Sequence, residues 1–196
     1  VVIKDNLTTL YNRAYFYYRL NSEIQRANRY NRPLSLLILD MDNFKQFNDR
    51  YGHPVGDQLL RVLSSTIRSN IRYSARKPSY ELDIPCRYGG DEFAIILPET
   101  TSAQATVVAE RLRKEINVKC GHEMVAQIQA AGGSHPREVP DVTVSIGVAS
   151  FPEHASITEA LVKAADDAMY VGKRTEKNKV YVSETASSLV PAKAPG

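Results

Sequence analysis

The chain has 196 residues, of which 43% are apolar, so it is long enough to bury one substantial core. Its formal net charge of +3 is too small to indicate nucleic-acid binding. No apolar run is long enough to span a bilayer and residues 1–4 carry no signal-peptide pattern, so we expect a cytoplasmic domain, whose full-length protein could still be membrane-anchored. Cys86 and Cys120 lack metal-ligand spacing and are expected as reduced thiols.

Helical and extended patterns alternate along the first half of the chain. Asn12 is the expected N-cap of a helix that ends at residues 31–33. The apolar run 34–39 predicts a strand buried on both faces, and residues 43–51 predict one or two helical turns. Apolar residues at helical spacing follow Asp57, which taken by itself is typical of a helix N-cap.

The second half contains further predicted elements and one ambiguous segment. The expected elements are a helix from Ser102, a strand over 142–150, a helix with a capping box at 156–159 and a short strand over 179–182. In the ambiguous segment 121–141, residues 124–128 favour a hairpin strand, and a mobile loop is expected after it. Residues 183–196 are rich in Ser, Ala and Pro and are expected to form a disordered tail or linker.

Two acidic motifs indicate a chemical function. Residues 87–93 read Arg-Tyr-Gly-Gly-Asp-Glu-Phe, and the pair Gly89-Gly90 predicts a tight turn that a bulky ligand can approach. Asp91 and Glu92 then begin a buried strand, and the first strand ends in Asp40-Met41-Asp42. Carboxylates from two strand ends are hard oxygen ligands of the kind that Mg²⁺ accepts together with substrate phosphates. The two motifs together predict a magnesium-dependent phosphate site.

Each motif alone also has an ordinary structural explanation. Acid pairs after a strand are common turn residues or helix caps, and a Gly-Gly pair is usually a turn. For Asp42 a turn-stabilising role is as good an explanation as a ligand role. The combination of both motifs favours the metal site, and the free amides of the helical turns after Asp40 favour a phosphate nearby.

Six segments of the chain, in order, resemble the GGDEF domain, the catalytic module of diguanylate cyclases. They are residues 5–13 with Phe16, 40–49, 52–57, 87–93, 143–149 and 165–170. The resemblance implies one GGDEF domain over residues 1–182, with an α/β (α+β) fold in which helices wrap a mixed central β-sheet. This fold is related to the palm of nucleotide polymerases and to class III nucleotidyl cyclases. It places Asp40 beside the Gly89-Gly90 turn, which is the bend of a hairpin.

The activity implied by the resemblance is the condensation of two GTP into cyclic di-GMP, a bacterial signalling molecule, with release of two pyrophosphates. The implied metal is Mg²⁺, with Mn²⁺ as an alternative, bound by Asp40, the main-chain carbonyl of Met41 and Asp91. Asp91 or Glu92 would assist deprotonation of the attacking 3′-hydroxyl. The product has twofold symmetry and one domain holds one substrate, so a homodimer is expected. We expect the chain to be a catalytic fragment that lacks a regulatory N-terminal domain and self-associates weakly.

The resemblance also assigns the parts of the substrate site. Asn48 and Asp57 stand at the positions of the guanine-binding pair, and an amide with an acid matches the guanine edge and not the adenine edge. The expected triphosphate partners are the amides near Phe44 and the side chains of Lys45, Lys173 and Lys177. Lys177 replaces the usual arginine, which keeps the charge but loses the forked geometry and favours weaker phosphate binding. A solvated helix end would equally explain lysines at these positions.

A product-inhibition site of the family is altered in this chain. Its Arg-x-x-Asp motif retains Asp83 but has Tyr80 in place of the arginine, while Arg111 matches a secondary arginine. Loss of the forked cation predicts weak or absent feedback inhibition, although Arg76 is a candidate substitute.

Two other functions fit the same residues. One is a non-catalytic module that senses GTP or cyclic di-GMP, which the intact signature disfavours. The other is a related nucleotidyl transferase that uses the same metal site, such as a cyclase that makes a mixed cyclic dinucleotide.

Overall fold

A computed structural model describes residues 2–74, 82–133 and 139–184, and a single five-stranded sheet forms the centre of these residues. The strands are β1 (Leu34–Met41), β2 (Ile84–Arg87), β3 (Glu92–Pro98), β4 (Val144–Phe151) and β5 (Val180–Val182), in the spatial order β2-β3-β1-β4-β5. β1 is antiparallel to β3 and β4, β2 is antiparallel to β3, and β5 is parallel to β4. The mixed sheet confirms the predicted fold class.

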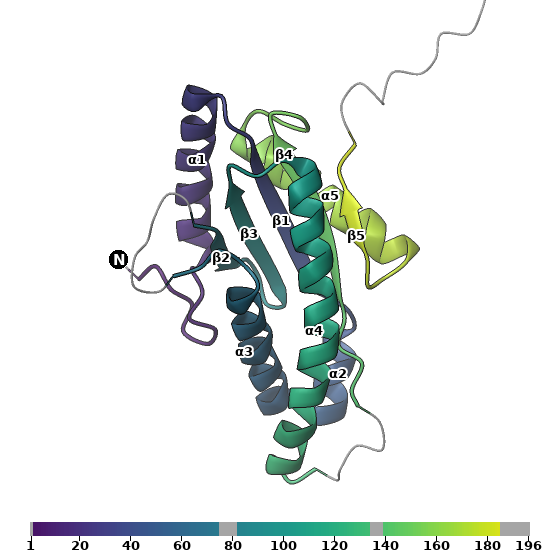
Figure 1. The fold of residues 1–196 in the computed structure, drawn as a ribbon. Helices are drawn as coiled ribbons and strands as arrows, with labels where there is room; N and C mark the ends of the chain where they lie inside the picture. The colour runs from purple at the N-terminus through teal and green to yellow at the C-terminus, as the bar shows by residue number, and fades with distance from the viewer. Residues whose placement is uncertain (1, 75–81, 134–138, 185–196) are drawn as a thin grey trace, which may run out of the picture.

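Five helices flank the sheet. They are α1 (Arg13–Tyr30), α2 (Phe44–Tyr51), α3 (His53–Ser69), α4 (Ser102–Ala130) and α5 (Thr158–Thr175). One face packs against α1 and α5, and the other packs against α3 and α4 (Figure 1). Along β1, Leu36 and Ile38 point into the first core while Leu37 and Leu39 point into the second. Helices on both faces explain why this strand is apolar throughout.

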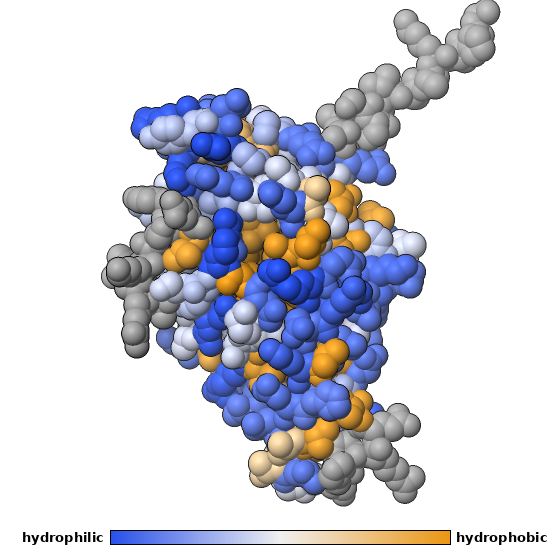
Figure 2. All heavy atoms as spheres, viewed as in Figure 1, coloured by the Kyte–Doolittle hydropathy of each residue, from blue (hydrophilic) through white to orange (hydrophobic). Residues whose placement is uncertain are grey.

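The surface seen over α3 and α4 is mostly hydrophilic, with small and scattered hydrophobic patches (Figure 2). Val107 and Val118 on α4 are among the exposed apolar side chains. Isolated apolar residues of this kind are normal on a solvated surface. Among the described residues, no helix has the length and apolarity needed to cross a bilayer.

Helix starts agree with the sequence in two cases and correct it in two. The Asn12 side chain accepts a 3.0 Å hydrogen bond from the Tyr15 amide and caps α1, and α4 begins at Ser102 as predicted. The expected N-cap role of Asp57 is wrong, because α3 already begins at His53, after Gly52 at φ 87°. The capping box expected at residues 156–159 is also wrong, since Ile157 is the N-cap of α5 and caps no amide through its side chain.

The hairpin strand predicted for residues 124–128 is wrong, because these residues belong to α4. The helix continues to Ala130, beyond the ends of the strands and beside α3 (Figure 1). Cys120, Met124 and Ile128 are four residues apart, share one helix face and are buried in the same core as α3. A Cβ at Gly121 would lie 2.5 Å from the Pro140 carbonyl oxygen, so this glycine lets the returning chain pack directly on α4.

Three predicted features lie wholly or partly outside the described residues. The described part of the chain ends at Glu184, shortly after the Ser183 amide donates a hydrogen bond to the Val148 carbonyl. The tail expected over 183–196 therefore falls almost entirely beyond it. Residues 75–81, which contain Tyr80 and Arg76, and residues 134–138 of the expected mobile loop are also outside it.

Candidate active site

The two acidic motifs meet at neighbouring strand ends. Asp40 and Glu92 are register partners in the antiparallel pair β1 and β3, and the Met41 amide donates a 3.2 Å hydrogen bond to the Asp91 carbonyl. The turn between β2 and β3 closes with bonds from the Tyr88 and Gly89 amides to the Glu92 carbonyl, at 2.8 and 3.1 Å. The signature residues therefore form the bend of a hairpin directly beside the end of β1.

The glycine pair of this hairpin is open on one side. A Cβ at Gly90 would meet no atom within 4 Å, so a ligand can approach the backbone there. A Cβ at Gly89 would instead lie 2.4 Å from Glu92 Oε2, so this glycine makes room for a site carboxylate. The two glycines thus serve different purposes in the same turn.

Arg87 and Tyr88 fix the hairpin to the rest of the domain. The Arg87 guanidinium donates to the Gly90 carbonyl at 2.8 Å and to the Asp5 carboxylate at 3.2 Å. Burial alone would raise the pKa of Asp5, but hydrogen bonds from Thr8 and the Arg87 charge outweigh it and lower the pKa. The Tyr88 hydroxyl lies 2.6 Å from the Tyr17 hydroxyl on α1. Sequence reasoning assigned no role to Asp5 or Tyr17, because both lie far along the chain from the hairpin.

Asp40 combines burial with an unpaired oxygen. Its Oδ2 lies 2.8 Å from Lys173 Nζ, and its buried Oδ1 has no hydrogen-bond partner among the described residues. Burial raises its pKa to about 6, Lys173 opposes this, and the charges of Asp91 and Glu92 add to the rise. An orphaned carboxylate oxygen next to further acids is the environment that a hard cation would stabilise.

The oxygen donors at this point fit a magnesium ion that completes its coordination with water and phosphate. Within the described ranges no group of three or more His, Cys, Asp and Glu side chains is arranged to hold a metal by itself. The available set is Asp40, the Met41 carbonyl and Asp91, which supplies only two carboxylates and one carbonyl. Mg²⁺ characteristically uses one or two carboxylates and takes its other ligands from water and substrate phosphates.

Asp42 is hydrogen-bonded within the protein, which supports the structural alternative left open by the sequence. Its buried carboxylate accepts hydrogen bonds from Thr143 Oγ1 at 2.7 Å, Ser145 Oγ at 2.8 Å and the Asn178 amide at 3.0 Å. These bonds join the end of β1 to β4 and to the segment before β5. A carboxylate so fully bonded within the protein stabilises the fold around the site.

Glu92 lies in an acidic environment that includes a residue on α5. Burial raises its pKa, and the charges of Asp166 and Asp91 raise it further against the opposing charges of Arg13 and Lys173. Asp166 belongs to a matching segment of the sequence, but no local pattern indicated that it faces Glu92.

The predicted phosphate residues occupy two positions around the end of β1. Lys173 Nζ contacts Asp40 and also donates to the Met41 carbonyl at 2.9 Å, while Lys177 Nζ donates to Asn43 Oδ1 at 2.6 Å. Asn43 precedes α2, which begins at the half-buried Phe44 and the exposed Lys45. Lys173 thus contacts two of the predicted metal ligands, Asp40 and the Met41 carbonyl, and Lys177 lies next to the start of α2.

The predicted guanine pair lies on α2 and α3. The Asn48 side-chain oxygen is buried and has no hydrogen-bond partner among the described residues, while Asp57 is exposed. A Cβ at Gly56 would lie only 1.7 Å from this Asn48 oxygen, so Gly56 creates the space that the amide occupies. Nothing in the sequence assigns Gly56 to the site, since a glycine within a helix carries no signal of what lies opposite it.

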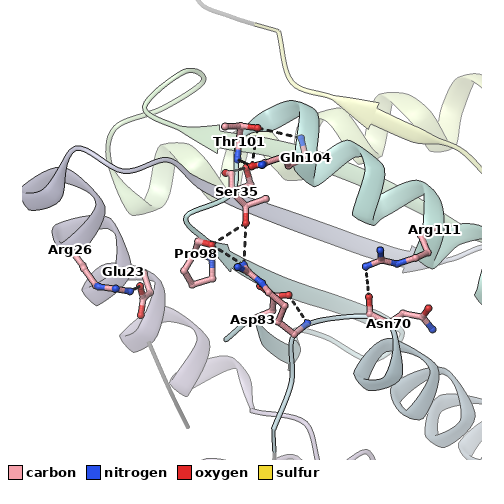
Figure 3. Close-up of polar contacts among 11 residues, drawn as sticks. Glu23, Arg26, Ser35, Asn70, Asp83, Pro98, Thr101, Gln104 and Arg111 are labelled. Carbon is pink, nitrogen blue, oxygen red and sulfur yellow. Dashed lines mark hydrogen bonds and ion pairs between the residues drawn. The ribbon is translucent and has the colours of Figure 1, made fainter. Parts of the chain in front are cut away.

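Asp83, at the altered inhibitory motif, is bound by an arginine of the same chain. Arg72 donates to the Asp83 carboxylate from its amide at 2.8 Å and from Nε and Nη2 at 3.0 and 2.6 Å. Its Nη2 also donates to the Pro98 carbonyl, and Arg111 donates to the Asn70 carbonyl across the same cavity of about 510 Å³ (Figure 3). Sequence reasoning missed Arg72, which lies outside the motif.

The central strands are antiparallel, acids lie at two adjacent strand ends, and a glycine hairpin lies beside them. This arrangement is that of a nucleotidyl-cyclase-type α+β domain. The chain belongs to the GGDEF family, because the family model described as "Diguanylate cyclase, GGDEF domain" matches residues 2–179.

Curated relatives and solved structures agree with this membership. The chain is 37% identical over 180 residues to the response regulator PleD of Caulobacter vibrioides, covering 92% of this chain and 36% of PleD. It is 38% identical over 176 residues to the diguanylate cyclase DosC of Escherichia coli, covering 90% of this chain and 34% of DosC. The chain therefore spans about a third of the length of these relatives.

Two solved GGDEF domains superimpose over most of the chain. The GGDEF domain of TpbB from Pseudomonas aeruginosa matches with a TM-score of 0.72 and 35% identity, covering 92% of this chain and 94% of that chain. The GGDEF domain of DgcB from Caulobacter crescentus, solved in complex with c-di-GMP, matches with a TM-score of 0.73 and 27% identity, covering 93% and 96%.

Proposed function

We propose that this domain is a diguanylate cyclase that condenses two GTP into cyclic di-GMP and two pyrophosphates. The observation that supports this most directly is the meeting of Asp40, Asp91 and Glu92 at adjacent strand ends, with a buried and unpaired Asp40 oxygen. An intact acidic site of this kind favours a catalyst over a non-catalytic sensing module. Family membership and relatives named as diguanylate cyclases support the same activity.

The metal residues in this proposal are Asp40, the Met41 carbonyl and Asp91. Mg²⁺, or Mn²⁺ as an alternative, supplies charge neutralisation at the reacting phosphate when it is bound there. Asp91 or Glu92 accepts the proton of the attacking 3′-hydroxyl. In the metal-free domain, burial and the Asp166 charge raise the pKa of Glu92, which favours proton uptake at this position.

The GTP in this proposal lies across α2 and α3. Asn48 and Asp57 select guanine, and the Asn48 side-chain oxygen has no partner among the described residues that would compete with the base. The triphosphate reaches the amides at Phe44 and the side chains of Lys45, Lys173 and Lys177. A lysine at position 177 binds phosphate as a point charge, so we expect it to bind the triphosphate more weakly than an arginine with two parallel donors would.

Turnover in this proposal needs two copies of the domain. Each copy presents one GTP, whose 3′-hydroxyl attacks the α-phosphate of the other, so the two sites must face each other across a twofold axis. The open side of Gly90 leaves the hairpin accessible to the opposing substrate. Since the relatives are more than twice as long as this chain, we propose that a regulatory N-terminal region controls this encounter, and that the domain is cytoplasmic even where the full-length protein is anchored to a membrane.

Feedback inhibition by the product is weak in this proposal. The Asp83 carboxylate already accepts three hydrogen bonds from Arg72, and the Arg111 guanidinium donates to the Asn70 carbonyl. Asp83 and Arg111, which would bind a guanine base, are therefore both engaged within the chain. Calorimetry with cyclic di-GMP is expected to show little or no binding at this cavity.

Product analysis tests the proposal against its alternatives. The dimerised protein is incubated with Mg²⁺ and GTP, and then with GTP and ATP mixed, and the products are identified by mass. We expect cyclic di-GMP in both cases, and Asp91→Ala is expected to abolish turnover while GTP binding persists. A mixed product would favour the other cyclase, and GTP binding without any product would favour a sensing module.

A further inference from the structure

The Lys173 ammonium contacts two of the oxygens that are proposed to bind the metal. Its Nζ is 2.8 Å from Asp40 Oδ2 and 2.9 Å from the Met41 carbonyl oxygen, and it lies 3.8 Å from Asp42 Oδ1. The side chains of Lys173 and Asp40 are only 21% and 17% exposed, so water screens this contact weakly. A dication about 2.1 Å from the same oxygens would come close to the ammonium, and like charges at low exposure repel strongly.

Within the described part of the chain, the acid in ion-pair distance of Lys173 Nζ after Asp40 is Asp42, at the longer distance of 3.8 Å. The nearest remaining acid, Asp42, already accepts hydrogen bonds from Thr143, Ser145 and the Asn178 amide. A new anion is therefore needed to stabilise the displaced ammonium. Lys177, four residues further along, is bonded to Asn43 beside the start of α2, which is where the triphosphate is proposed to lie.

The helix that carries Lys173 is held firmly against the sheet. A Cβ at Gly147 of β4 would lie 2.0 Å from the Ala165 carbonyl oxygen of α5, and a Cβ at Gly172 would lie 2.1 Å from the Tyr181 ring. These two contacts show that α5 packs directly on β4 and Tyr181. Rotation of the flexible Lys173 side chain moves the ammonium without disturbing this packing.

We propose that Lys173 competes with the divalent cation for Asp40 and the Met41 carbonyl, and releases them when a substrate triphosphate offers it another partner. This inference rests on the magnesium site proposed above. Its consequence is that the metal and the nucleotide bind as a coupled pair, because each removes a charge that opposes the other. The domain thereby disfavours a tightly held metal before GTP arrives.

Mn²⁺ titrated alone, with the free ion followed by electron paramagnetic resonance, tests this competition without turnover. Lys173→Met is expected to bind Mn²⁺ about tenfold or more tightly than the unchanged protein, since a charge-assisted contact no longer holds Asp40. Lys173→Arg keeps the charge and is expected to restore weak binding. Lys177→Met removes a nearby charge that touches neither oxygen and is expected to change the affinity by less than about threefold.

Asp40→Asn in the Lys173→Met background separates the two proposals. If Lys173→Met binds Mn²⁺ no more than threefold more tightly than the unchanged protein, or no more tightly than Lys177→Met, the competition is overturned. If the added Asp40→Asn leaves the tight binding intact, the ion lies elsewhere and the proposed metal site fails with it. Thermal melting of each variant, with Lys173→Arg as the conservative comparison, verifies that the fold is retained.

Discussion

Asp40 lowers the stability of the fold while it supplies the proposed site. Its pKa is raised from 3.8 to about 6, mainly by burial, so its ionised form is disfavoured in the folded state. The protonated carboxyl does not carry this cost, so the free energy of unfolding is highest, as far as Asp40 is concerned, below pH 3.8. It falls as the pH rises through about 6 and Asp40 ionises in the folded state. Functional acids held in such environments are a common source of lost stability.

Replacement of this acid by a neutral isostere is therefore expected to stabilise the domain. Asp40→Asn should raise the free energy of unfolding by about 1–2 kcal/mol at pH 8, after allowance for partial exposure, and by much less at pH 4. Urea denaturation in EDTA at both pH values measures this difference. Asp42→Asn, which turns one of the two oxygens that accept three internal hydrogen bonds into an amide donor, is the matched control and should destabilise the domain. A destabilised Asp40→Asn at pH 8 would contradict the argument.

Gly56 connects helix packing to base recognition. In Gly56→Ala the new Cβ would take the place of the Asn48 oxygen, which must then rotate away from the proposed guanine position. We expect the KM for GTP to rise about tenfold or more, which is the loss of roughly one good hydrogen bond. Alanine favours a helix by up to about 1 kcal/mol over glycine, so the melting temperature should be unchanged or higher.

Steady-state kinetics and thermal melting of Gly56→Ala together distinguish recognition from folding. Ser65→Ala, at an exposed position on the same helix, is the control and should leave the KM and the melting temperature unchanged. An unchanged KM in Gly56→Ala would show that the Asn48 oxygen has no part in binding GTP.

The sequence predicted site residues that belong to contiguous motifs and missed those that act from a distance. Asp40, Asp91 and Glu92 were expected to meet because each ends or begins an apolar run, and because the resemblance to the GGDEF domain implies that the two motifs are neighbours. Arg72 and Gly56 could not be found this way, because their partners Asp83 and Asn48 lie 11 and 8 residues away, outside any local motif that includes both. Contacts of this kind depend on how elements pack, and no local pattern encodes them.

At the scale of elements, α4 shows where periodicity misleads. Met124 and Ile128 are four residues apart, a spacing that suits a helix face and also the same face of a strand. The residue between them distinguishes the two, since Ala126 is exposed in the helix and would point to the same side as Met124 in a strand. Alanine carries too little hydrophobic information to decide this from sequence.

Three substitutions on this part of α4 test its role in the core. Met124→Ala is expected to destabilise the domain by about 2–4 kcal/mol, because a fully buried side chain is removed next to α3. Glu123→Ala, on the exposed face, should change stability by less than about 0.5 kcal/mol. Ala126→Glu should be tolerated in the helix and would be strongly destabilising in a buried strand. Urea denaturation compares all three variants.

At the scale of the whole molecule, the arrangement of the sheet follows from the sequence better than the helix ends do. The apolar runs of β1 and β3 indicate cover on both faces, and helical stripes on either side supply it. Helix ends depend on single backbone angles, such as the positive φ of Gly52, and these set α3 one turn earlier than Asp57 suggested.

One domain offers one set of acids and one guanine pair, so the rate should depend on how often two domains meet. At concentrations where the domain is mainly monomeric, halving the protein concentration is expected to lower the rate of cyclic di-GMP formation about fourfold, because the active species is the pair. Fusion of a dimeric coiled coil to the N-terminus should make the rate proportional to concentration and raise it. Analytical ultracentrifugation under the same conditions gives the association state. A protein that sediments as a monomer, yet turns over at a rate proportional to its concentration, would contradict the paired mechanism.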